Sequence, residues 1–209
     1  MTSTQTQQQR GLRSAVCGSR ALLAGLAALS LSGCISIGGE APEMLLTLTP
    51  QSTLAAGPGP SGQAASALLI EEPDAEQRIA VTRVPVQVDG SSVAYLTGAE
   101  WVERPARLFR RLLAETVRAR SGRLVMERDD SSVVPGETLR GTLRQFGYDA
   151  AGRSVTVTFD AVRRTRDGTL QTRRFTATEQ NVEPEGIVAG AALNRSANRV
   201  AQEVADWIG

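Results

Sequence analysis

Leu31, Ser32, Gly33 and Cys34 combine a hydrophobic side chain, two small residues and a thiol in one short run. This pattern resembles a lipobox, in which the small residues let the backbone enter a signal peptidase and the cysteine thiol forms a thioether to diacylglycerol. We therefore expect Cys34 to become the N-terminus of the mature chain and to carry a diacylglycerol and an N-acyl chain. The alternative is an ordinary buried cysteine at the end of a short membrane helix.

Residues 1–33 have the layout of a secretory signal peptide. Arg10, Arg13 and Arg20 precede an apolar run over residues 21–31, and the segment contains no acidic residue. The apolar run is shorter than the roughly 20 residues that a membrane-spanning helix needs. The order of positive charge, apolar run and small residues is that of a cleaved signal. We expect the segment to be removed.

The residue after Cys34 is Ile35. In enteric-type lipoproteins an aspartate at that place favours retention in the inner membrane. By resemblance we expect this chain to be lipid-anchored at the periplasmic face of the outer membrane, with the inner membrane as the alternative. Residues 34–43 are expected to form a lipidated, flexible tether, and residues 44–209 a single domain.

Composition excludes several classes of function. The chain has no histidine, all of its basic residues are arginines, and its two cysteines are Cys17, inside the signal, and Cys34. Cysteine–histidine metal sites, serine–histidine–aspartate triads and lysine nucleophiles are therefore absent. Without lysine there is no Gly-x-x-x-x-Gly-Lys-Ser/Thr phosphate loop, so the chain is not an ATPase motor. Loss of the three signal arginines lowers the net charge from +1 to −2, which gives no electrostatic reason to expect nucleic acid.

Helical spacing of apolar residues predicts two main helices, over residues 103–121 and 184–208. Pro105 suits the first turn of the earlier helix, and Gly122 is a suitable stop. Arg111 and Glu115 are four residues apart and could pair weakly. Arginines on the polar side of this helix and a tryptophan at the boundary of each helix are candidate partner-docking residues: Trp101, Arg107, Arg111, Arg118 and Trp207. The alternatives are a solvated helix face and core packing of the tryptophans.

The remaining pattern predicts strands separated by turns and loops. Short strands are expected over residues 44–49, 67–70, 78–82, 92–96 and 124–126, and longer ones over 138–146, 154–163 and 170–178. Asp89-Gly90 favours a hairpin, and two further turns make the longer strands an antiparallel meander with one buried face. The expected fold is a two-layer α+β domain, with two helices packed on a mainly antiparallel sheet.

Two groups of carboxylates could do other chemistry. Asp160 lies near Arg163 and Arg164 in sequence, which would suit an envelope hydrolase, and Asp129-Asp130 could bind a divalent cation from a loop. The simpler interpretation is that these carboxylates are solvated or ion-paired. We expect neither enzymatic activity nor a metal site.

The mature chain resembles the ABC-type transport auxiliary lipoproteins, a PqiC-like family, over most of residues 44–208. The resemblance rests on the strands Leu45–Leu48 and Arg78–Arg83, on Tyr95, Leu96, Trp101, Pro105, Leu108 and Leu112, on Phe146 and Phe159, and on the C-terminal Ala205–Ile208. The departures from the family pattern are Met44 and Leu45, where an aromatic pair is common, and a longer insert at residues 57–60.

This resemblance implies an accessory subunit beside an MCE-type ABC transporter that moves phospholipid or other hydrophobic molecules between the envelope membranes. The implied partners are an MCE-domain protein, a permease and an ATPase, all on other chains. The alternative function is a periplasmic lipid-binding carrier that holds its cargo between helices and sheet.

Overall fold

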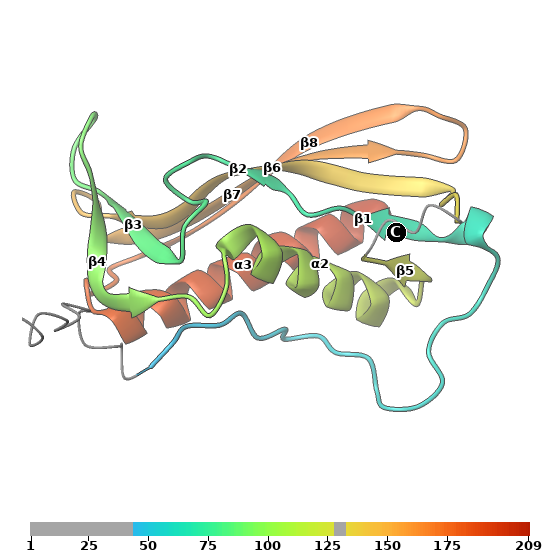
Figure 1. Ribbon diagram of the computed structural model, residues 1–209, viewed down its shortest axis with the longest axis horizontal. Coiled ribbons are helices and arrows are strands. Elements are labelled where there is room, and N and C mark those ends of the chain that lie inside the picture. Colours follow the sequence, from blue (N-terminus) through green and yellow to red (C-terminus); the bar gives the residue numbers. More distant parts are fainter. Residues whose placement is uncertain (1–43, 128–132) are drawn as a thin grey trace, which may run out of the picture. The chain divides into compact units, whose positions relative to one another are not determined.

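The longest strand of the sheet, β6 (Glu137–Asp149), pairs with strands on both of its edges. The structure is a computed structural model that describes residues 44–127 and 133–209. One edge of β6 pairs antiparallel with β7 (Ser154–Arg164), which pairs antiparallel with β8 (Leu170–Gln180). Figure 1 shows these three strands as one long layer. The meander predicted from the sequence is confirmed, including its order and its turns.

The other edge of β6 pairs with three short strands placed end to end, all parallel to it. They are β1 (Leu68–Ile70), β2 (Asp74–Ala75) and β3 (Arg83–Gln87). Two further strands extend this part of the sheet: β4 (Val93–Glu100) pairs antiparallel with β3, and β5 (Val125–Met126) pairs parallel with β1. The sheet is mixed, and it is mostly antiparallel because its longest pairings, β6 with β7 and β7 with β8, are antiparallel.

Side chains of β7 alternate between the two faces of the sheet, as the sequence predicts. Val155, Val157, Phe159 and Ala161 are almost completely buried on the face that meets the helices. On the open face, the hydroxyl of Thr156 lies 3.1 Å from that of Thr178 on the neighbouring strand. The apolar side chains on this side of the meander thus form part of the core.

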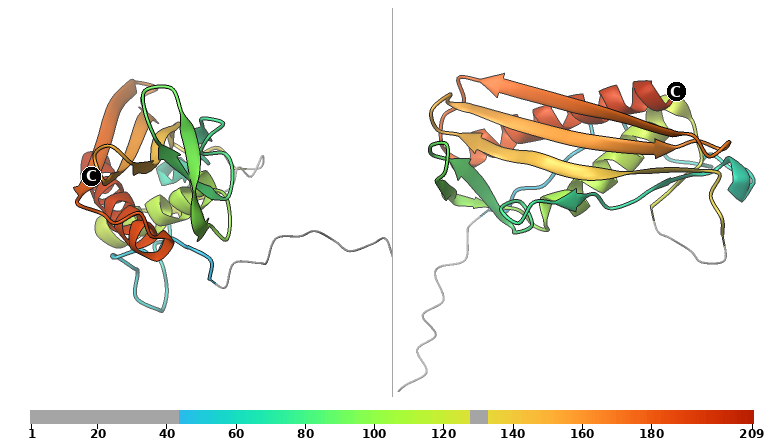
Figure 2. Two further views of the ribbon diagram at one scale, coloured as in Figure 1. Left: turned by 90° about the vertical axis from the view of Figure 1, so that its left-hand side faces the viewer. Right: turned by 90° about the horizontal axis from the view of Figure 1, so that it is seen from above.

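Both helices, α2 (Pro105–Ser121) and α3 (Gly186–Ile208), cover the same face of the sheet (Figures 1 and 2). Pro105 stands in the first turn of α2, and Gly122 ends the helix with a left-handed φ of 63° that glycine adopts without strain. The predicted two-layer α+β architecture is confirmed. Among the described residues, no helix is long and apolar enough to cross a membrane.

The predicted strand over residues 78–82 is wrong. Ile79 and Ala80 instead close a turn by donating their amide hydrogens to the Glu76 carbonyl, over 2.8 and 3.0 Å. This turn drives the Ile79 side chain into the core, and regular pairing begins only at Arg83. A turn that buries a single apolar side chain has the same short sequence pattern of apolar residues as a short strand, so the two cannot be distinguished from sequence.

The predicted strand over residues 44–49 is reduced to a single bridge between Leu46 and Trp101. Further along, the segment is held by side chains of α3: Thr49 N donates to Asn194 Oδ1 over 2.9 Å, and Gln51 N donates to Asn198 Oδ1 over 2.8 Å. These side-chain partners replace the ladder of a strand. The Pro- and Gly-rich loop that follows is exposed, as expected, and ends in the short 3₁₀ helix η2 (Ala64–Ser66).

Candidate functional site

The predicted lipidation site lies outside the described residues. Cys34 and its neighbours Leu31, Ser32 and Gly33 belong to this part of the chain, and so does the acidic pair Asp129-Asp130. Their chemical roles stay predictions. The sites that the structure does describe are therefore the surfaces and hollows of the domain.

Trp101 is a core residue. Its side chain is 1% exposed, and its ring meets Phe146 of β6 edge to face with 5.4 Å between the ring centroids. A partner therefore cannot reach the indole in this structure, which favours the core-packing interpretation. Trp207, in the last turn of α3, is half-buried against Phe175 of β8 at 5.6 Å and keeps part of its ring at the surface.

Two predicted docking arginines, Arg107 and Arg111, lie half-exposed on α2 and share one carboxylate. Arg111 Nη2 donates to both oxygens of Glu103, over 2.8 and 3.0 Å, and Arg107 lies 3.6 Å from the same group. Glu72 lies 3.9 Å from Arg107. The surface is thus a mixed-charge network with two guanidinium groups still open to solvent, rather than a purely positive face.

The third predicted docking arginine, Arg118, is less accessible. Its Nη2 donates to Glu127 Oε1 over 2.7 Å and to the Val125 carbonyl over 3.2 Å, so it fastens β5 to α2. The predicted pairing of Arg111 with Glu115 does not form. Glu115 instead accepts the amide hydrogen of Leu54 over 2.7 Å, because the loop before β1 crosses this part of α2.

Asp160 lies on the open face of the sheet, between arginines of the two neighbouring strands. Arg174 of β8 donates to both of its carboxylate oxygens, over 2.5 and 2.7 Å, and Arg144 of β6 donates over 3.0 Å. The hydrogen bonds from Arg174 have the largest effect on the pKa of Asp160. Burial acts in the opposite direction, but with the added hydrogen bond from Arg144 and the positive charge of both arginines the pKa is lowered to about 2. A carboxyl group with this pKa stays ionised at neutral pH and cannot serve as a general acid.

Glu137 forms a second carboxylate–arginine cluster that the sequence did not reveal. Its buried carboxylate lies 2.8 Å from Arg123, 2.8 Å from Arg163 and 3.3 Å from Arg166. Burial acts to raise the pKa of Glu137, but the hydrogen bonds from Arg163 and Arg123 outweigh it, so that the pKa is lowered. Arg163 therefore pairs with Glu137 rather than with Asp160. Three guanidinium groups around one carboxylate join β6, β7 and the segment after α2.

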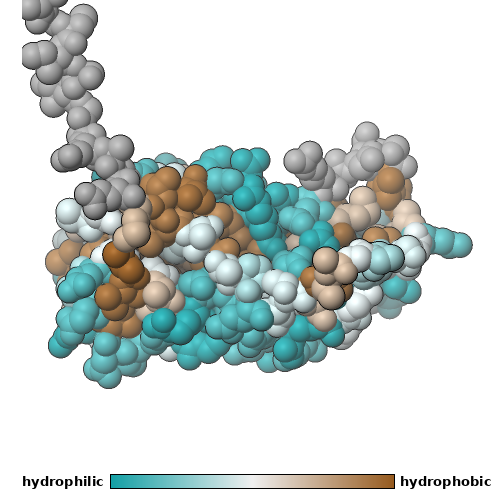
Figure 3. Space-filling view, turned by 90° about the horizontal axis from the view of Figure 1, so that it is seen from below, coloured by the Kyte–Doolittle hydropathy of each residue, from teal (hydrophilic) through white to brown (hydrophobic). Residues whose placement is uncertain are grey.

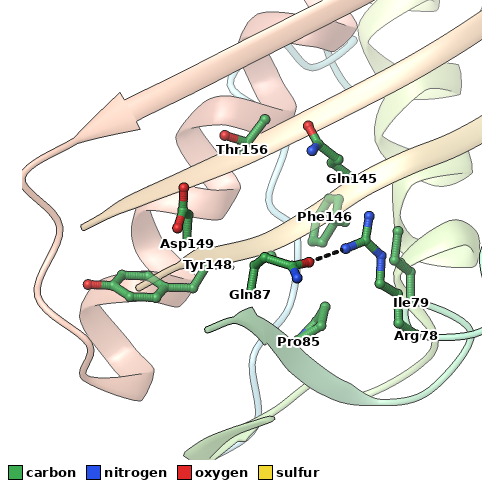
Figure 4. A pocket seen from close by; sticks show the side chains of 10 residues that line it. Arg78, Ile79, Pro85, Gln87, Gln145, Phe146, Tyr148, Asp149 and Thr156 are labelled. Atoms are coloured by element: carbon green, nitrogen blue, oxygen red, sulfur yellow. Dashed lines mark hydrogen bonds between the residues drawn. The ribbon is translucent and has the colours of Figure 1, made fainter. Parts of the chain in front are cut away.

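The hollow shown in Figure 4 lies between β3 and β6. Its volume is about 110 Å³, and Gln87, Phe146 and Tyr148 contribute to its lining. Arg78 Nη1 donates to Gln87 Oε1 over 2.7 Å across one side of it. Sites for small molecules usually measure about 300–1,000 Å³ and are mostly apolar. This hollow is too small and too polar to hold a lipid.

Two wider hollows are shallow and charged. One of about 690 Å³ lies beside the Glu137 cluster, and one of about 450 Å³ lies beside Asp160 and Arg174. Both are open to solvent and are lined in part by charged side chains, whereas a lipid carrier needs an enclosed and mostly apolar site. The core between sheet and helices is instead filled by packed aromatic and aliphatic side chains, such as Phe109, Phe159 and Leu113.

The fold is similar to that of two solved structures. A protein from Xanthomonas campestris, assigned to a family called DUF330, matches with a TM-score of 0.66 and 19% identity, covering 79% of this chain and 94% of that protein. An uncharacterized protein matches with a TM-score of 0.60 and 16% identity, covering 71% of this chain and 95% of its own. At these identities the likeness concerns the fold. No curated protein matches the sequence.

The family match rests on the sequence of nearly the whole domain. The model of the ABC-type transport auxiliary lipoprotein component matches residues 46–205, from the segment that bridges Trp101 to the last turn of α3. This confirms the resemblance drawn from the strands, helices and tryptophans. The chain therefore belongs to the family of ABC-type transport auxiliary lipoprotein components.

Proposed function

We propose that the mature protein is held by acyl chains on Cys34 at the periplasmic face of the outer membrane. There it serves as an accessory subunit of an MCE-type ABC transporter that moves phospholipid or other hydrophobic molecules. The observation that carries the proposal is the family match over residues 46–205, downstream of a signal segment that ends in a lipobox pattern. Its partners are an MCE-domain protein, a permease and an ATPase.

The structure supports a docking role over a carrier role for this subunit. The interior is packed among the described residues, and the three hollows described above are either smaller than a lipid site or lined in part by charged side chains. Arg107 and Arg111 remain half-exposed at the surface although they pair with Glu103. Partly solvated guanidinium groups of this kind form bidentate contacts with carboxylates on a partner.

The first test is affinity purification of the full chain from gently crosslinked membranes, with mass spectrometry of proteins and lipids together. Recovery of an MCE-domain protein with its permease and ATPase is the expected result. Recovery of stoichiometric lipid without any transporter chain would contradict the accessory role and favour the carrier role. A Cys34→Ala variant, which cannot form the thioether, should lose both its acyl chains and its co-sedimentation with membranes.

The docking surface can be tested by charge reversal. We expect Arg107→Glu combined with Arg111→Glu to lower the yield of crosslinked partner several-fold, since the contact would change from attraction to repulsion. The matched control is Arg153→Glu combined with Arg195→Glu, which changes the net charge by the same amount. Both arginines are similarly exposed, and they pair with Glu183 and Glu179 respectively. An equal loss of yield in both variants would assign the effect to net charge rather than to this surface.

A further inference from the structure

An apolar surface lies at the end of the domain where the described chain begins. It consists of Met44, Leu45, Val102, Ile187 and Val188, here called the apolar end patch, whose side chains are between 39% and 59% exposed. Figure 3 shows apolar residues gathered at this end of the molecule. Isolated exposed apolar residues are common, but a contiguous group of them marks a surface that contacts another apolar phase.

The patch is contiguous because its three segments touch. Leu46 N donates to the Glu100 carbonyl over 2.7 Å, and Val102 N donates to the Leu46 carbonyl over 2.9 Å, which places Met44 and Leu45 beside Val102. The Leu46 side chain lies against Gly190 of α3 so closely that a Cβ there would stand 2.5 Å from it. Ile187 and Val188 belong to the turn of α3 just before this contact.

The length of the chain between Cys34 and Met44 limits how far the apolar end patch can lie from the lipid. Ten residue steps separate Cys34 from Met44, and they span at most about 35 Å when fully extended. This reach is no longer than α3, whose 23 residues measure about 35 Å. The apolar end patch, which contains Met44, is therefore the part of the described domain whose distance from Cys34 the chain limits most closely.

We propose that the apolar end patch rests on the lipid surface that holds Cys34, so that the domain stands on the membrane by this end. The inference relies on the lipidation in the proposed function and adds a second membrane contact to it. Apolar side chains buried in the bilayer add their own binding free energy to that of the acyl chains on Cys34. Glu185 is exposed at the start of α3, two residues before Ile187. The surface is therefore suited to zwitterionic rather than anionic headgroups.

The mature lipoprotein allows a direct test because its only cysteine is consumed by the lipid. Ile187→Cys introduces one free thiol in the patch for an environment-sensitive fluorophore. Leu170→Cys is the matched control, since Leu170 is 60% exposed and Ile187 59%, but Leu170 lies at the start of β8, outside the patch. Both labelled proteins are reconstituted into phosphatidylcholine vesicles, and flotation shows whether each is anchored.

We expect both proteins to float, and only the label at position 187 to shift its emission to the blue and be quenched by brominated lipid. A label at 187 that stays in water on floating protein would overturn the membrane contact while leaving the lipid anchor intact. If the label at 187 shifts to the blue without vesicles, and the shift grows with protein concentration, the patch contacts a second copy of the chain. That result would also overturn the proposed membrane contact. If neither protein floats, the lipid anchor on Cys34 is contradicted, and the proposed function and the membrane contact of the patch are contradicted with it.

Vesicle charge gives a further check. Inclusion of anionic phosphatidylglycerol should reduce the blue shift at position 187, because the carboxylate of Glu185 is repelled. A larger shift on anionic vesicles would contradict the assignment to zwitterionic headgroups. The double variant Ile187→Ser with Val188→Ser should remain folded, since both side chains are partly exposed, and should lose protection of the patch from solvent in hydrogen exchange on vesicles.

Discussion

The ring of Phe109 on α2 meets the ring of Phe159 on β7 edge to face, with 5.4 Å between the ring centroids and 68° between the ring planes. Both side chains are buried, and they join the helix layer to the middle strand of the meander. Aromatic pairs in this geometry add stabilisation beyond the apolar area that they bury. The contact therefore couples the two layers at the centre of the core.

Phe159→Ala should lower the free energy of unfolding by about 3–5 kcal/mol, because it removes a fully buried ring and leaves a cavity against Phe109. Chemical denaturation followed by circular dichroism measures the change. Thr172→Ala is the control: Thr172 is exposed on β8, in the same sheet, and its replacement should cost less than about 0.5 kcal/mol. Equal effects of the two substitutions would contradict the role of the aromatic pair.

Asn198→Ala should release the segment after Met44 from α3. The buried Asn198 side chain accepts from Gln51 N over 2.8 Å and donates to the Thr49 carbonyl over 3.0 Å. Its removal leaves both backbone groups without that partner, at a cost of about 1–3 kcal/mol. Hydrogen exchange of the Gln51 amide should accelerate.

The control for this prediction is Gln202→Ala on the same helix. Gln202 contacts the segment only through an exposed side-chain hydrogen bond to Gln51, over 3.2 Å. Its substitution should leave the exchange rates unchanged. Faster exchange in the Gln202 variant alone would show that the outer contact, rather than the buried asparagine, holds the segment.

Asp160→Asn should lower stability at neutral pH and have less effect in acid. The pKa of Asp160 is about 2 in the folded chain and has its ordinary value of 3.8 when unfolded, so its ion pairs stabilise the fold above that ordinary value. This stabilisation is lost as the pH falls through about 2. Because the arginines are largely exposed, we expect at most about 1 kcal/mol at neutral pH. Urea titrations at several pH values measure the difference, and a pH-independent difference would contradict the ion-pair account.

Glu137→Gln should cost more than Asp160→Asn, although both change one carboxylate beside arginines. Glu137 is buried, and its substitution leaves the guanidinium groups of Arg123 and Arg163 without the carboxylate that both of them contact. Breaking a buried ion pair in this way costs about 3–5 kcal/mol. Thermal unfolding of the two variants side by side at neutral pH gives the comparison. A smaller loss for the Glu137 variant would show that solvent screens this cluster.

The parts of the fold that follow from local signals could be predicted. The alternation of Val155, Val157 and Phe159 specifies a strand with one buried face, and the glycine turns on either side specify its hairpins. Pro105 and Gly122 specify where α2 starts and stops. The strand predicted over residues 78–82 failed because Ile79 is anchored in the core from a turn, which leaves the same short apolar pattern.

Contacts between residues far apart in the chain could not be predicted from such local signals. Arg163 follows Asp160 closely in sequence but pairs with Glu137, because successive side chains of a strand point to opposite faces of the sheet. Arg111 pairs with Glu103 and leaves Glu115 to the loop at Leu54. The apolar character of Ile187 and Val188 was visible, but their proximity to Met44 depends on where the segment crosses α3.

The sequence by itself determined the signal pattern ending at Cys34, the exclusion of histidine and lysine chemistry, the meander and both helices. These follow from residue type, periodicity and turn chemistry, which act over a few residues. Only the tertiary structure decided that short parallel strands line one edge of β6, that Trp101 is buried, and that an apolar patch forms beside the start of the domain. Those features arise where segments far apart in the chain meet, because burial and ion pairing depend on the whole packed arrangement.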